Sequence, residues 1–516
     1  MKICLAIILL LFLSAATHGQ ESEVNGRIVD NNKRPLPYTT IRLKNAAIGV
    51  VSNQNGDFRL QLRQQFLLDT LIISYIGYNL EVIAVSQLKL QELNIIILKE
   101  AATQLGTIEI QARRSGRLTA AKIVAAAIKN IEYNYPIDHF RYVAYYRDYQ
   151  IKEKNYTNLN EAIVRVIDDG FESNDQIDTQ LELMQYRINK TFPTDTVSSK
   201  PYDNKEKKFI PQARVGTFGG NELAILRVHD ALRNYENYAY SFVGTFSRDF
   251  IKNHTLQISK VITHNNAIKL YEIEFHSRLS ASGDSHFSSG KIYIETQNYK
   301  IHKLEYSMHE KSWKKDNLIY NVKVEYNDYH GKMYLNYISF NNKFRMRNPD
   351  DFKVVDTRIL SDFSGFSILF SHSPETLSAT RKSNYRFTID GKKVELDTVM
   401  FSSTGKGKEV IAVVKNPREY GFFADAKLAS RMSIDYGSIK DDLNREVNKM
   451  TFIEATQYRE IFVQKVEAET TPNTQVVAMD KFIPLSEAGV TSNMENFEDY
   501  WMNTPLKSSI DYNESF

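Results

Sequence analysis

Several short runs of alternating apolar and polar residues lie between residues 24 and 98. In residues 58–63 every second residue is apolar, which predicts a strand with one face in a core and the other in water. Residues 71–75 repeat this pattern, and residues 94–98 form a nearly continuous apolar run suited to a central strand. The pair Asn55-Gly56 tolerates positive φ and predicts a tight hairpin. Such strands, separated by turn residues, predict an antiparallel sandwich of about seven strands.

Four motifs in this segment carry a family resemblance: Val24–Asp30, Arg34–Leu43, Asn55–Leu60 and Thr70–Tyr78. Together they resemble the carboxypeptidase-like regulatory domain of envelope proteins of Bacteroidetes-type bacteria, where it often precedes a TonB-dependent receptor. The resemblance implies a transthyretin-like fold and an accessory module without chemistry of its own. It covers residues 23–110, of which residues 105–110 look like the family's closing strand.

The first residues have the three-part form of a secretory signal peptide. Met1-Lys2 precede an apolar run from Ile3 to Leu13, and small and polar residues follow up to Gln20. We therefore expect an exported protein, located in the periplasm or at the outer-membrane surface. An uncleaved membrane anchor is the alternative, although the apolar run is short for a span. The only cysteine, Cys4, lies in this leader, so the mature chain has no thiol for a disulfide, for catalysis or for a metal site.

The charge balance argues against one class of partner. The chain has 65 basic and 62 acidic residues, and removal of the leader takes away one lysine. Nucleic-acid binding needs a concentrated basic face, so we expect no nucleic-acid partner. Because no later segment is a long apolar run, we expect a protein that is soluble or peripherally attached to the outer membrane.

The chain is long enough for several domains. Its 516 residues correspond to about three domains of ordinary size. We divide it into a signal peptide (1–19), the regulatory sandwich (20–112), a helix with a mixed α/β segment (113–239), an antiparallel meander (240–350) and a C-terminal β/loop region (351–516). The expected fold class is mainly β (α+β overall), with a seven-stranded sandwich followed by an amphipathic helix and a large antiparallel sheet.

A helix and a meander are predicted after the sandwich. Leu118, Ala121, Ala125, Ile128 and Ile131 recur at helical spacing. The strand that follows is crowded with tyrosine and arginine, which can stack on bases or sugars but more often pack across strands. The meander strands are predicted at residues 256–262, 267–276, 291–295, 300–308, 319–326 and 333–340, and a hairpin at residues 385–401 around Asp390-Gly391.

The strand rhythm of the meander carries a second resemblance. It is visible in Gly290–Ile294, in Tyr299–Leu304 and in Gly331–Leu335. This rhythm is similar to that of lipoprotein-carrier proteins of the LolA type, which implies a sheet able to shelter an apolar ligand.

Two pairs of residues have the spacing of a reactive site. His302 and Glu305 match the two-ligand spacing of zinc carboxypeptidases, but residues three apart in a strand point to opposite faces. Glu272 and Glu274 would share a strand face about 6–7 Å apart, a separation compatible with a glycosidase acid pair. Adjacent surface glutamates are the more common explanation of this second pattern.

The remaining candidates are weaker. His286 lies beside Asp284 in a loop rich in glycine and serine, within a stretch that contains seven histidines: His254, His264, His276, His286, His302, His309 and His330. Ser403 and Lys406 have the Ser-x-x-Lys spacing of some hydrolases without the companion motifs. Phosphate-binding loops and dinucleotide fingerprints are absent from the sequence. We therefore assign no catalytic, cofactor-binding or metal-binding residue and expect no cofactor, and we leave open whether the protein is an enzyme.

Three functions remain open. The leading hypothesis is an exported, non-catalytic cell-envelope protein whose sandwich serves for docking and whose curved sheet binds an apolar or extended ligand, such as a lipid, or an envelope partner protein. The first alternative is a periplasmic or surface hydrolase that uses histidines and glutamates of the middle region. The second is an outer-membrane receptor-related protein, although the roughly four hundred residues after residue 110 are few for a plug and about 22 strands.

Overall fold

The computed structural model of the protein describes residues 22–490, apart from residues 47, 54, 102–117, 153–154, 191, 201, 203–207, 211–220, 238–243, 312–316, 361, 363, 423–426 and 468–476. The expected signal peptide and the expected closing strand at residues 105–110 lie outside the described residues. Contacts divide the chain into two compact units, one of residues 1–344 and 454–516 and the other of residues 345–453.

Seven strands at the start of the described chain form two small sheets with a shared core. They are β1 (Ser22–Val29), β2 (Thr40–Leu43), β3 (Gly49–Val51), β4 (Asp57–Leu62), β5 (Thr70–Ser74), β6 (Glu81–Ala84) and β7 (Leu93–Ile97), with 3-10 turns at Gln64–Phe66 and Val85–Gln87. One sheet has the order β4-β1-β7 and the other the order β3-β2-β5-β6. Val24 and Leu60 of the first sheet and Ile41 and Ile73 of the second are fully buried in this core. The seven-stranded sandwich is thus confirmed.

Two details of the sandwich differ from the prediction. Strands β1 and β7 pair in parallel, because the chain crosses to the other sheet between them and returns in the same direction. Asn55-Gly56 does not close a hairpin, since β3 and β4 belong to different sheets. Instead, the Asn53 side chain accepts hydrogen bonds from the backbone N–H groups of Asn55 and Asp57, both at 2.9 Å. Gly56 has a φ of 74°, and a Cβ there would lie 2.4 Å from the Ile28 carbonyl oxygen.

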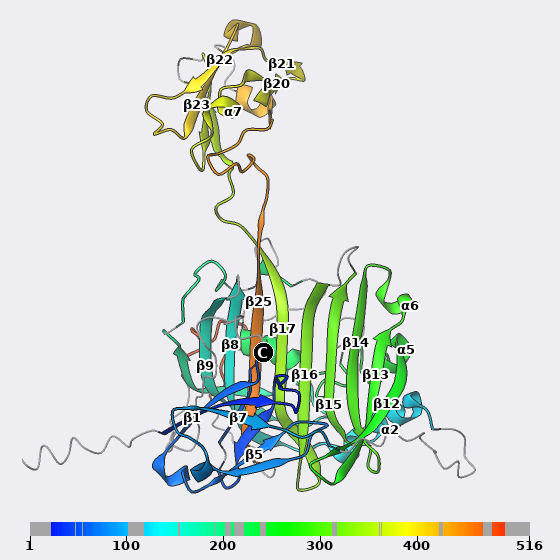
Figure 1. The fold of residues 1–516 in the computed structure, drawn as a ribbon. Helices are drawn as coiled ribbons and strands as arrows, with labels where there is room; N and C mark the ends of the chain where they lie inside the picture. The colour runs from blue at the N-terminus through cyan, green and yellow to red at the C-terminus, as the bar shows by residue number, and fades with distance from the viewer. Residues whose placement is uncertain are drawn as a thin grey trace, which may run out of the picture. The chain divides into compact units, whose positions relative to one another are not determined.

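A much larger sheet of eleven described strands belongs to the same unit. Its strands are β8 (Phe140–Lys152), β9 (Asn155–Asp168), β10 (Gln180–Ile188), β11 (Lys208–Phe209), β12 (His254–His264), β13 (Ile268–Ser277), β14 (His286–Glu295), β15 (Ile301–Glu310), β16 (Asn317–Tyr329), β17 (Lys332–Arg347) and β25 (Phe452–Glu467). The order is β10-β9-β8-β25-β17-β16-β15-β14-β13-β12, with β11 paired to β17 (Figure 1). The six strands of the predicted meander are confirmed and lie consecutively from β17 to β12.

Strand β25 comes from the far end of the chain and lies between β8 and β17. It pairs antiparallel with β8 from Thr456 opposite Ile151 to Glu467 opposite Arg141. Three of the five segments expected from the sequence therefore supply strands to one sheet.

Helices cover one face of the large sheet. They are α2 (Ala120–Lys129), α3 (Ile131–Asn134), α4 (Glu222–Val228) and α5 (Phe250–Asn253), and a short α6 (Leu279–Ser282) precedes β14. Helix α2 packs against β12 and β14, and the His229 ring, just after α4, stacks on Phe340 of β17 at 3.5 Å. None of the helices that the structure describes is long and apolar enough to cross a membrane.

The predicted helix is confirmed as α2 and α3, but the buried face differs. Ile123, Val124 and Ala127 are buried, whereas Ala125 is exposed. Alanines lie nearly all around this helix, so its apolar stripe is wide and the spacing alone did not identify the buried side.

The sandwich packs against the opposite face of the large sheet. Two clusters of buried side chains join them: Tyr38 and Val51 with Tyr337 and Phe462, and Ile76 with Ile262, Leu270 and Tyr293. The Lys323 ammonium lies 4.0 Å from the centre of the Tyr38 ring, a cation–π contact across the same interface. The Ser74 hydroxyl donates a hydrogen bond of 3.0 Å to Asn265 Oδ1. The sandwich is thus docked on the sheet of its own chain.

Charged side chains of alternating sign form a row across the face that carries the sandwich. The row consists of Arg187, Glu161, Arg147 and Glu460 on β10, β9, β8 and β25, and of Lys323, Glu305, Lys291 and Glu274 on β16, β15, β14 and β13. Arg147 and Glu460 form an ion pair, and each side chain is only 4% exposed. Burial opposes the ionisation of Glu305, but Lys303 and Lys323 outweigh it and lower its pKa to about 2.

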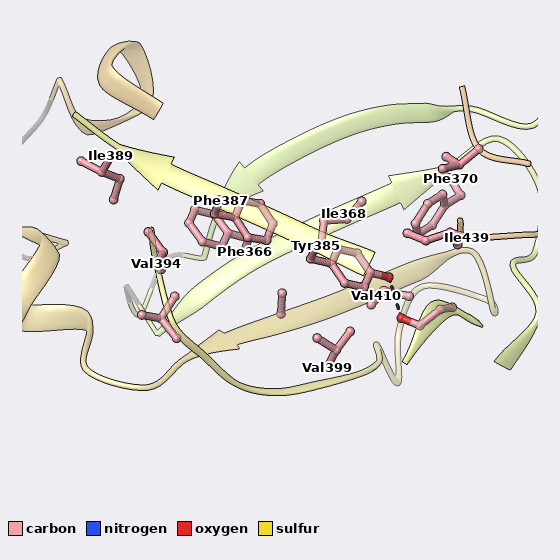
Figure 2. Close-up of a cluster of buried hydrophobic side chains, with 14 of the residues drawn as sticks. Phe366, Ile368, Phe370, Tyr385, Phe387, Ile389, Val394, Val399, Val410 and Ile439 are labelled. Carbon is pink, nitrogen blue, oxygen red and sulfur yellow. Dashed lines mark hydrogen bonds between the residues drawn. The ribbon is translucent and has the colours of Figure 1, made fainter. Parts of the chain in front are cut away.

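Residues 345–453 form the second unit, which has its own core. Strands β18 (Val354–Ile359), β19 (Gly365–Phe370), β23 (Glu409–Val414) and β22 (Leu396–Phe401) pair in this order, and β21 (Lys392–Lys393), β20 (Tyr385–Ile389) and β24 (Met432–Tyr436) form the second sheet. The unit also contains α7 (Thr376–Ala379) and 3-10 turns at Lys382–Asn384, Pro417–Tyr420 and Leu428–Arg431. Figure 2 shows Phe366 and Phe387, one from each sheet, side by side in the core. Their rings stack with centroids 4.2 Å apart.

The hairpin predicted around Asp390-Gly391 is confirmed. It joins β20 to β21, and Ile389 lies opposite Lys392 in the pairing. Asp390 and Gly391 have φ angles of 48° and 79°, the positive values that a two-residue hairpin of this kind requires.

We expect Phe387→Ala to weaken the second unit alone. The substitution should lower its free energy of unfolding by about 3–5 kcal/mol, because it leaves a cavity beside Phe366 in a closed core. Hydrogen exchange of the full chain at increasing urea concentrations measures this as an earlier loss of protection in β19, β20 and β23. The matched control is Leu377→Ala, because Leu377 is 76% exposed. Equal loss of protection in β14 to β16 would show instead that the two units unfold together.

We expect each member of the buried ion pair of Arg147 and Glu460 to be needed because the other member is charged and buried. Arg147→Met should lower the free energy of unfolding by about 3–5 kcal/mol, because Glu460 then stays buried without its cation. The double variant Arg147→Met/Glu460→Leu should recover most of this loss, because it removes both charges. Urea unfolding followed by circular dichroism measures both. A double variant as unstable as the single one would contradict this explanation.

Candidate functional site

The two glutamates that suggested an acid pair are bound to lysines. The Lys291 ammonium lies 2.8 Å from Glu272 Oε1 and 3.2 Å from Glu274 Oε1, and the Lys260 ammonium lies 3.7 Å from Glu272 Oε2. Lys291 and Glu274 belong to the row of charges on the sandwich-bearing face. The structure therefore gives these carboxylates ion-pair partners on neighbouring strands.

His302 and Glu305 both lie on β15, and their side chains have different partners. His302 Nε2 lies 3.6 Å from Glu295 Oε2, and its ring lies 5.6 Å from the ring of His264. Glu305 lies 2.8 Å from the Lys303 ammonium. The structure does not bring the two side chains together around a common ligand.

The other candidates are dispersed. His286 Nδ1 lies 2.8 Å from the Ser285 hydroxyl, and the neighbouring Asp284 is exposed. Ser403 and Lys406 lie in the turn between β22 and β23, in the second unit. The histidines spread from β12 to the turn after β16. Among the described residues, no group of three or more histidine, cysteine, aspartate or glutamate side chains is placed to hold a metal ion.

A cavity of about 240 Å³, lined by both polar and apolar side chains, lies near the turn between β8 and β9. Its lining comes from β8 (Asp148, Gln150), β9 (Asn158, Leu159, Asn160), β10 (Tyr186, Ile188), the segment after β10 (Asn189, Phe192, Thr194, Ser199), the start of α4 (Glu222), β25 (Gln457) and residues 484–486. The cavity is many times larger than the ~10–15 Å³ that one water molecule needs. It is therefore large enough for a small ligand.

Strand irregularities create this cavity. The pairing of β8 with β9 shifts between Asp148 and Gln150, which is a β-bulge. Asn158 on the partner strand has a φ of 53°, a value that asparagine tolerates better than most residues. Bulges redirect side chains, and here the consecutive residues Asn158, Leu159 and Asn160 all line the cavity, which a regular strand would not allow.

The side chains of the wall are joined by hydrogen bonds. Asn158 Nδ2 donates to Gln150 Oε1 at 2.8 Å, and Gln150 Nε2 donates to Gln457 Oε1 at 2.7 Å. Gln457 Nε2 then donates to Asp148 Oδ1 at 3.3 Å. From the other side, Asn160 Nδ2 donates to the same oxygen at 3.0 Å. The chain of amides ends on Asp148 and holds the wall in one arrangement.

Asp148 is the titratable group at the centre of the wall. It is 4% exposed and accepts a hydrogen bond of 2.8 Å from the Tyr146 hydroxyl. Burial and the nearby carboxylate of Glu222 raise the pKa of Asp148 to about 7, against the opposing effects of Asn160, Tyr146 and Arg459. Asp148 can therefore gain or lose a proton near neutral pH.

Two buried cations lie behind the wall. Arg459 Nε lies 2.5 Å from Glu222 Oε2, and its Nη1 donates to Asn342 Oδ1 at 2.5 Å. The Lys208 ammonium donates to the Ser198 carbonyl at 2.9 Å, and burial lowers the pKa of Lys208 to about 8. Neither cation lines the cavity.

A second polar cluster lies deeper in the same unit and is closed. Arg233 Nη2 donates to Asp168 Oδ1 at 2.9 Å, and Arg227 forms an ion pair with Asp175 and a hydrogen bond with the Tyr142 hydroxyl. The space beside these groups is only about 20 Å³, room for little more than one water molecule. This cluster fastens the segment of α4 to β8 and β9, and we assign it a structural role.

The sequence reasoning missed every residue of the cavity wall. Asp148, Asn160 and Gln457 belong to no short motif, and Gln457 is about three hundred residues away from Asp148 in the chain. One signal was present. Asp148 follows Tyr142, Ala144 and Tyr146 at a spacing of two, so a carboxylate stands in line with the apolar face of a predicted strand.

We expect Asp148→Asn to remove one component of the pH dependence of stability. The raised pKa means that the folded protein holds a proton at Asp148 between about pH 4 and pH 7, whereas the unfolded chain does not. The contribution of Asp148 to stability is thus present at low pH and is lost as the pH rises to 7. Relative to the wild type, Asp148→Asn should gain up to about 4 kcal/mol from pH 4 to pH 7.

Urea unfolding at several pH values measures this difference. The matched control is Asp284→Asn, because Asp284 is exposed in a turn of the same unit. Its stability should stay at a constant offset from the wild type. A constant offset for Asp148→Asn as well would contradict the raised pKa of Asp148.

Comparison with known proteins identifies one part of the chain. Residues 24–110 match the family model of the CarboxypepD_reg-like domain. No curated protein matches the chain. A solved structure of a DUF1329 family protein from Desulfovibrio piger ATCC 29098 aligns with 44% of this chain and 87% of its own length, at 6% identity and a TM-score of 0.20, which is too low to carry an argument. The N-terminal sandwich is therefore a CarboxypepD_reg-like domain.

Proposed function

We propose that this protein is an exported, non-catalytic binding protein of the cell envelope. Its β-rich fold and its CarboxypepD_reg-like domain support this proposal, because the resemblance of that domain implies an accessory module. The cavity beside β8 and β9 is the ligand site. The leader-like first residues support export.

The hydrogen-bonded wall is the observation that carries the proposal. Gln150, Asn158 and Gln457 hold one another in place, and the chain of bonds ends on Asp148. A wall that is already ordered loses little conformational freedom when a ligand arrives, which favours binding. The space beside this wall is large enough for a small molecule.

The sandwich and the sheet have separate roles in this proposal. The sandwich is fixed to the face with the row of charges, where Tyr38 and Phe462 share a buried cluster. Asp148 lies on the same face of β8 as Tyr142 and Tyr146, which is the face covered by helices. Docking and ligand binding therefore use opposite faces of one sheet, so a ligand does not compete with the sandwich.

The chemistry of the wall favours a polar ligand over the apolar one expected from the sequence. Two carboxyl groups, Asp148 and Glu222, and five side-chain amides line the cavity. A lipid tail would strip these groups of water and return no hydrogen bonds, which costs several kcal/mol. The lipid in the leading hypothesis is thus replaced by a small polar molecule.

A hydrolase is the second candidate, and one observation favours it. A carboxyl group with a pKa near 7 is suited to general acid catalysis, and Asp148 lies near a second carboxylate, Glu222. Glu222 is engaged by Arg459, however, at 2.5 Å. Binding is therefore the better-supported function.

Native mass spectrometry of the protein isolated from cell-envelope fractions tests the proposal. We expect the folded protein to carry a small bound molecule that is released unchanged on unfolding. Thr194→Trp should reduce the occupancy of the bound molecule at least tenfold. Thr194 is an exposed residue of the cavity wall, and an indole ring at this position fills the space. The control Thr255→Trp, on an exposed position of β12, should keep full occupancy.

Three results would contradict the proposal. A bound molecule that Thr194→Trp retains would place the ligand elsewhere. A released molecule that the protein has altered chemically would favour the hydrolase. Recovery of the protein only from the cytoplasm would overturn the envelope location.

A further inference from the structure

We propose that the cavity binds a small organic cation, a molecule with an ammonium or guanidinium group. This inference rests on the proposed binding function and names the chemical class of its ligand. It follows from three properties of the wall: its charges, its free hydrogen-bonding atoms and its aromatic rings.

The ionisable groups of the wall are acidic. Among the described residues that line the cavity, the charged ones are Asp148 and Glu222. The cations nearby are directed to other partners: Arg459 to Asn342 and Glu222, and Lys208 to backbone carbonyls. Lys208 is also covered by the rings of Tyr202 and Phe344, at 4.3 and 4.4 Å. Among the described residues that line the cavity, no lysine or arginine faces a phosphate or carboxylate ligand, whereas two carboxyl groups do.

The hydrogen-bond donors of the wall are largely used within the wall. The amide groups of Asn158, Gln150 and Gln457 each donate to another side chain of the wall. Asn160 Nδ2 donates to Asp148, and the Tyr186 hydroxyl donates to Asn160 Oδ1 at 2.9 Å. The acceptors that remain for a ligand are chiefly those of the two carboxyl groups, beside the hydroxyls of Thr194, Ser199 and Ser486, which can donate or accept. An ammonium or guanidinium group needs only acceptors, whereas a neutral sugar also needs donors.

Both carboxylates have capacity left for a ligand. A carboxylate accepts about four hydrogen bonds, and Asp148 accepts three, from Tyr146, Asn160 and Gln457. Glu222 Oε2 is bound to Arg459. Hydrogen bonds between a cation and a carboxylate are roughly twice as strong as neutral ones.

Aromatic rings complete the wall. Tyr186 and Phe192 line the cavity together with the two carboxylates. The faces of such rings attract an ammonium or guanidinium group, by about 0.5–2 kcal/mol. Carboxylates and aromatic rings in one cavity are the combination that recognises an organic cation.

Cation binding should displace a proton. The titratable and charged groups that act on Asp148 are Tyr146, Tyr186, Glu222, Arg459 and Lys208. A bound cation favours the ionised form of Asp148, because opposite charge within a few ångströms lowers a carboxyl pKa. Binding below pH 7 is therefore coupled to the release of a proton, and binding well above pH 7 is not.

Isothermal titration calorimetry on the purified full chain tests the proposal with named probes. Putrescine, agmatine and choline represent the cations, maltose a neutral polyol, and succinate an anion. We expect at least one cation to bind ten times more tightly than maltose and succinate. In buffers of different ionisation enthalpy, that cation should release close to one proton at pH 6 and none at pH 8.5. Absence of binding by all three cations would overturn the proposal.

Variants of Asp148 test whether this residue is responsible for cation binding and proton release. Asp148→Asn should weaken the binding of the cation at least tenfold and abolish proton release, whereas Asp148→Glu, which keeps the charge, should retain both. The exposed control Asp284→Asn should behave as the wild type. If Asp148→Asn does not fold, the proton release of the wild-type protein at pH 6 and pH 8.5 still tests the proposal. An unchanged affinity in a folded Asp148→Asn would overturn the proposal.

The outcomes separate this inference from the proposed function. If maltose binds tightly and Thr194→Trp abolishes this binding, the proposal of a cationic ligand is overturned and the proposed binding function is kept. Absence of binding by every probe, together with absence of a bound molecule in native mass spectrometry, would overturn both.

Discussion

The structure of the larger unit depends on the pairing of β25 with its two neighbours. This strand joins β10, β9 and β8 on one side to the six-stranded meander on the other. Its side chains take part in three of the features described above: Gln457 lines the cavity and Arg459 binds Glu222 behind its wall, Glu460 pairs with Arg147, and Phe462 contacts the sandwich. Without β25, the edges of β8 and β17 would be open, and neither the cavity nor the seat of the sandwich would be complete.

The two faces of the large sheet differ in the ionisation of their carboxyl groups. On the face that carries the sandwich, each charge in the row has a neighbour of opposite sign on the next strand, so the carboxylate of the half-buried Glu305 remains ionised. On the face covered by helices, burial and the nearby carboxylate of Glu222 raise the pKa of Asp148, so it retains a proton up to about pH 7. Carboxylates of the same sheet thus have opposite properties because their partners differ.

Local patterns predicted the parts of the fold that depend on neighbouring residues. The sandwich strands, the six strands of the meander and the hairpin at Asp390-Gly391 follow from alternation and turn chemistry within a few residues. The place of β25 could not be predicted this way, because its pairing with β8 joins residues about three hundred positions apart. The partners of Glu272 and Glu274 were hidden for the same reason, since Lys291 meets them only across a strand pair. The cavity depends in addition on a bulge at Asp148, which the alternation of apolar and polar residues does not predict.

The insertion of the second unit between β17 and β25 has a consequence for biosynthesis. The unit begins and ends at one point, where the Asn348 N–H donates to the Thr451 carbonyl at 3.1 Å. The ribosome must therefore translate about 100 residues after β17 before β25 emerges, roughly 5–20 s at ordinary elongation rates. During this interval β8 and β17 have no central neighbour, and their exposed backbone is open to wrong pairing. A nascent chain of this design needs either a chaperone at that stage or a delay in folding until β25 has been made.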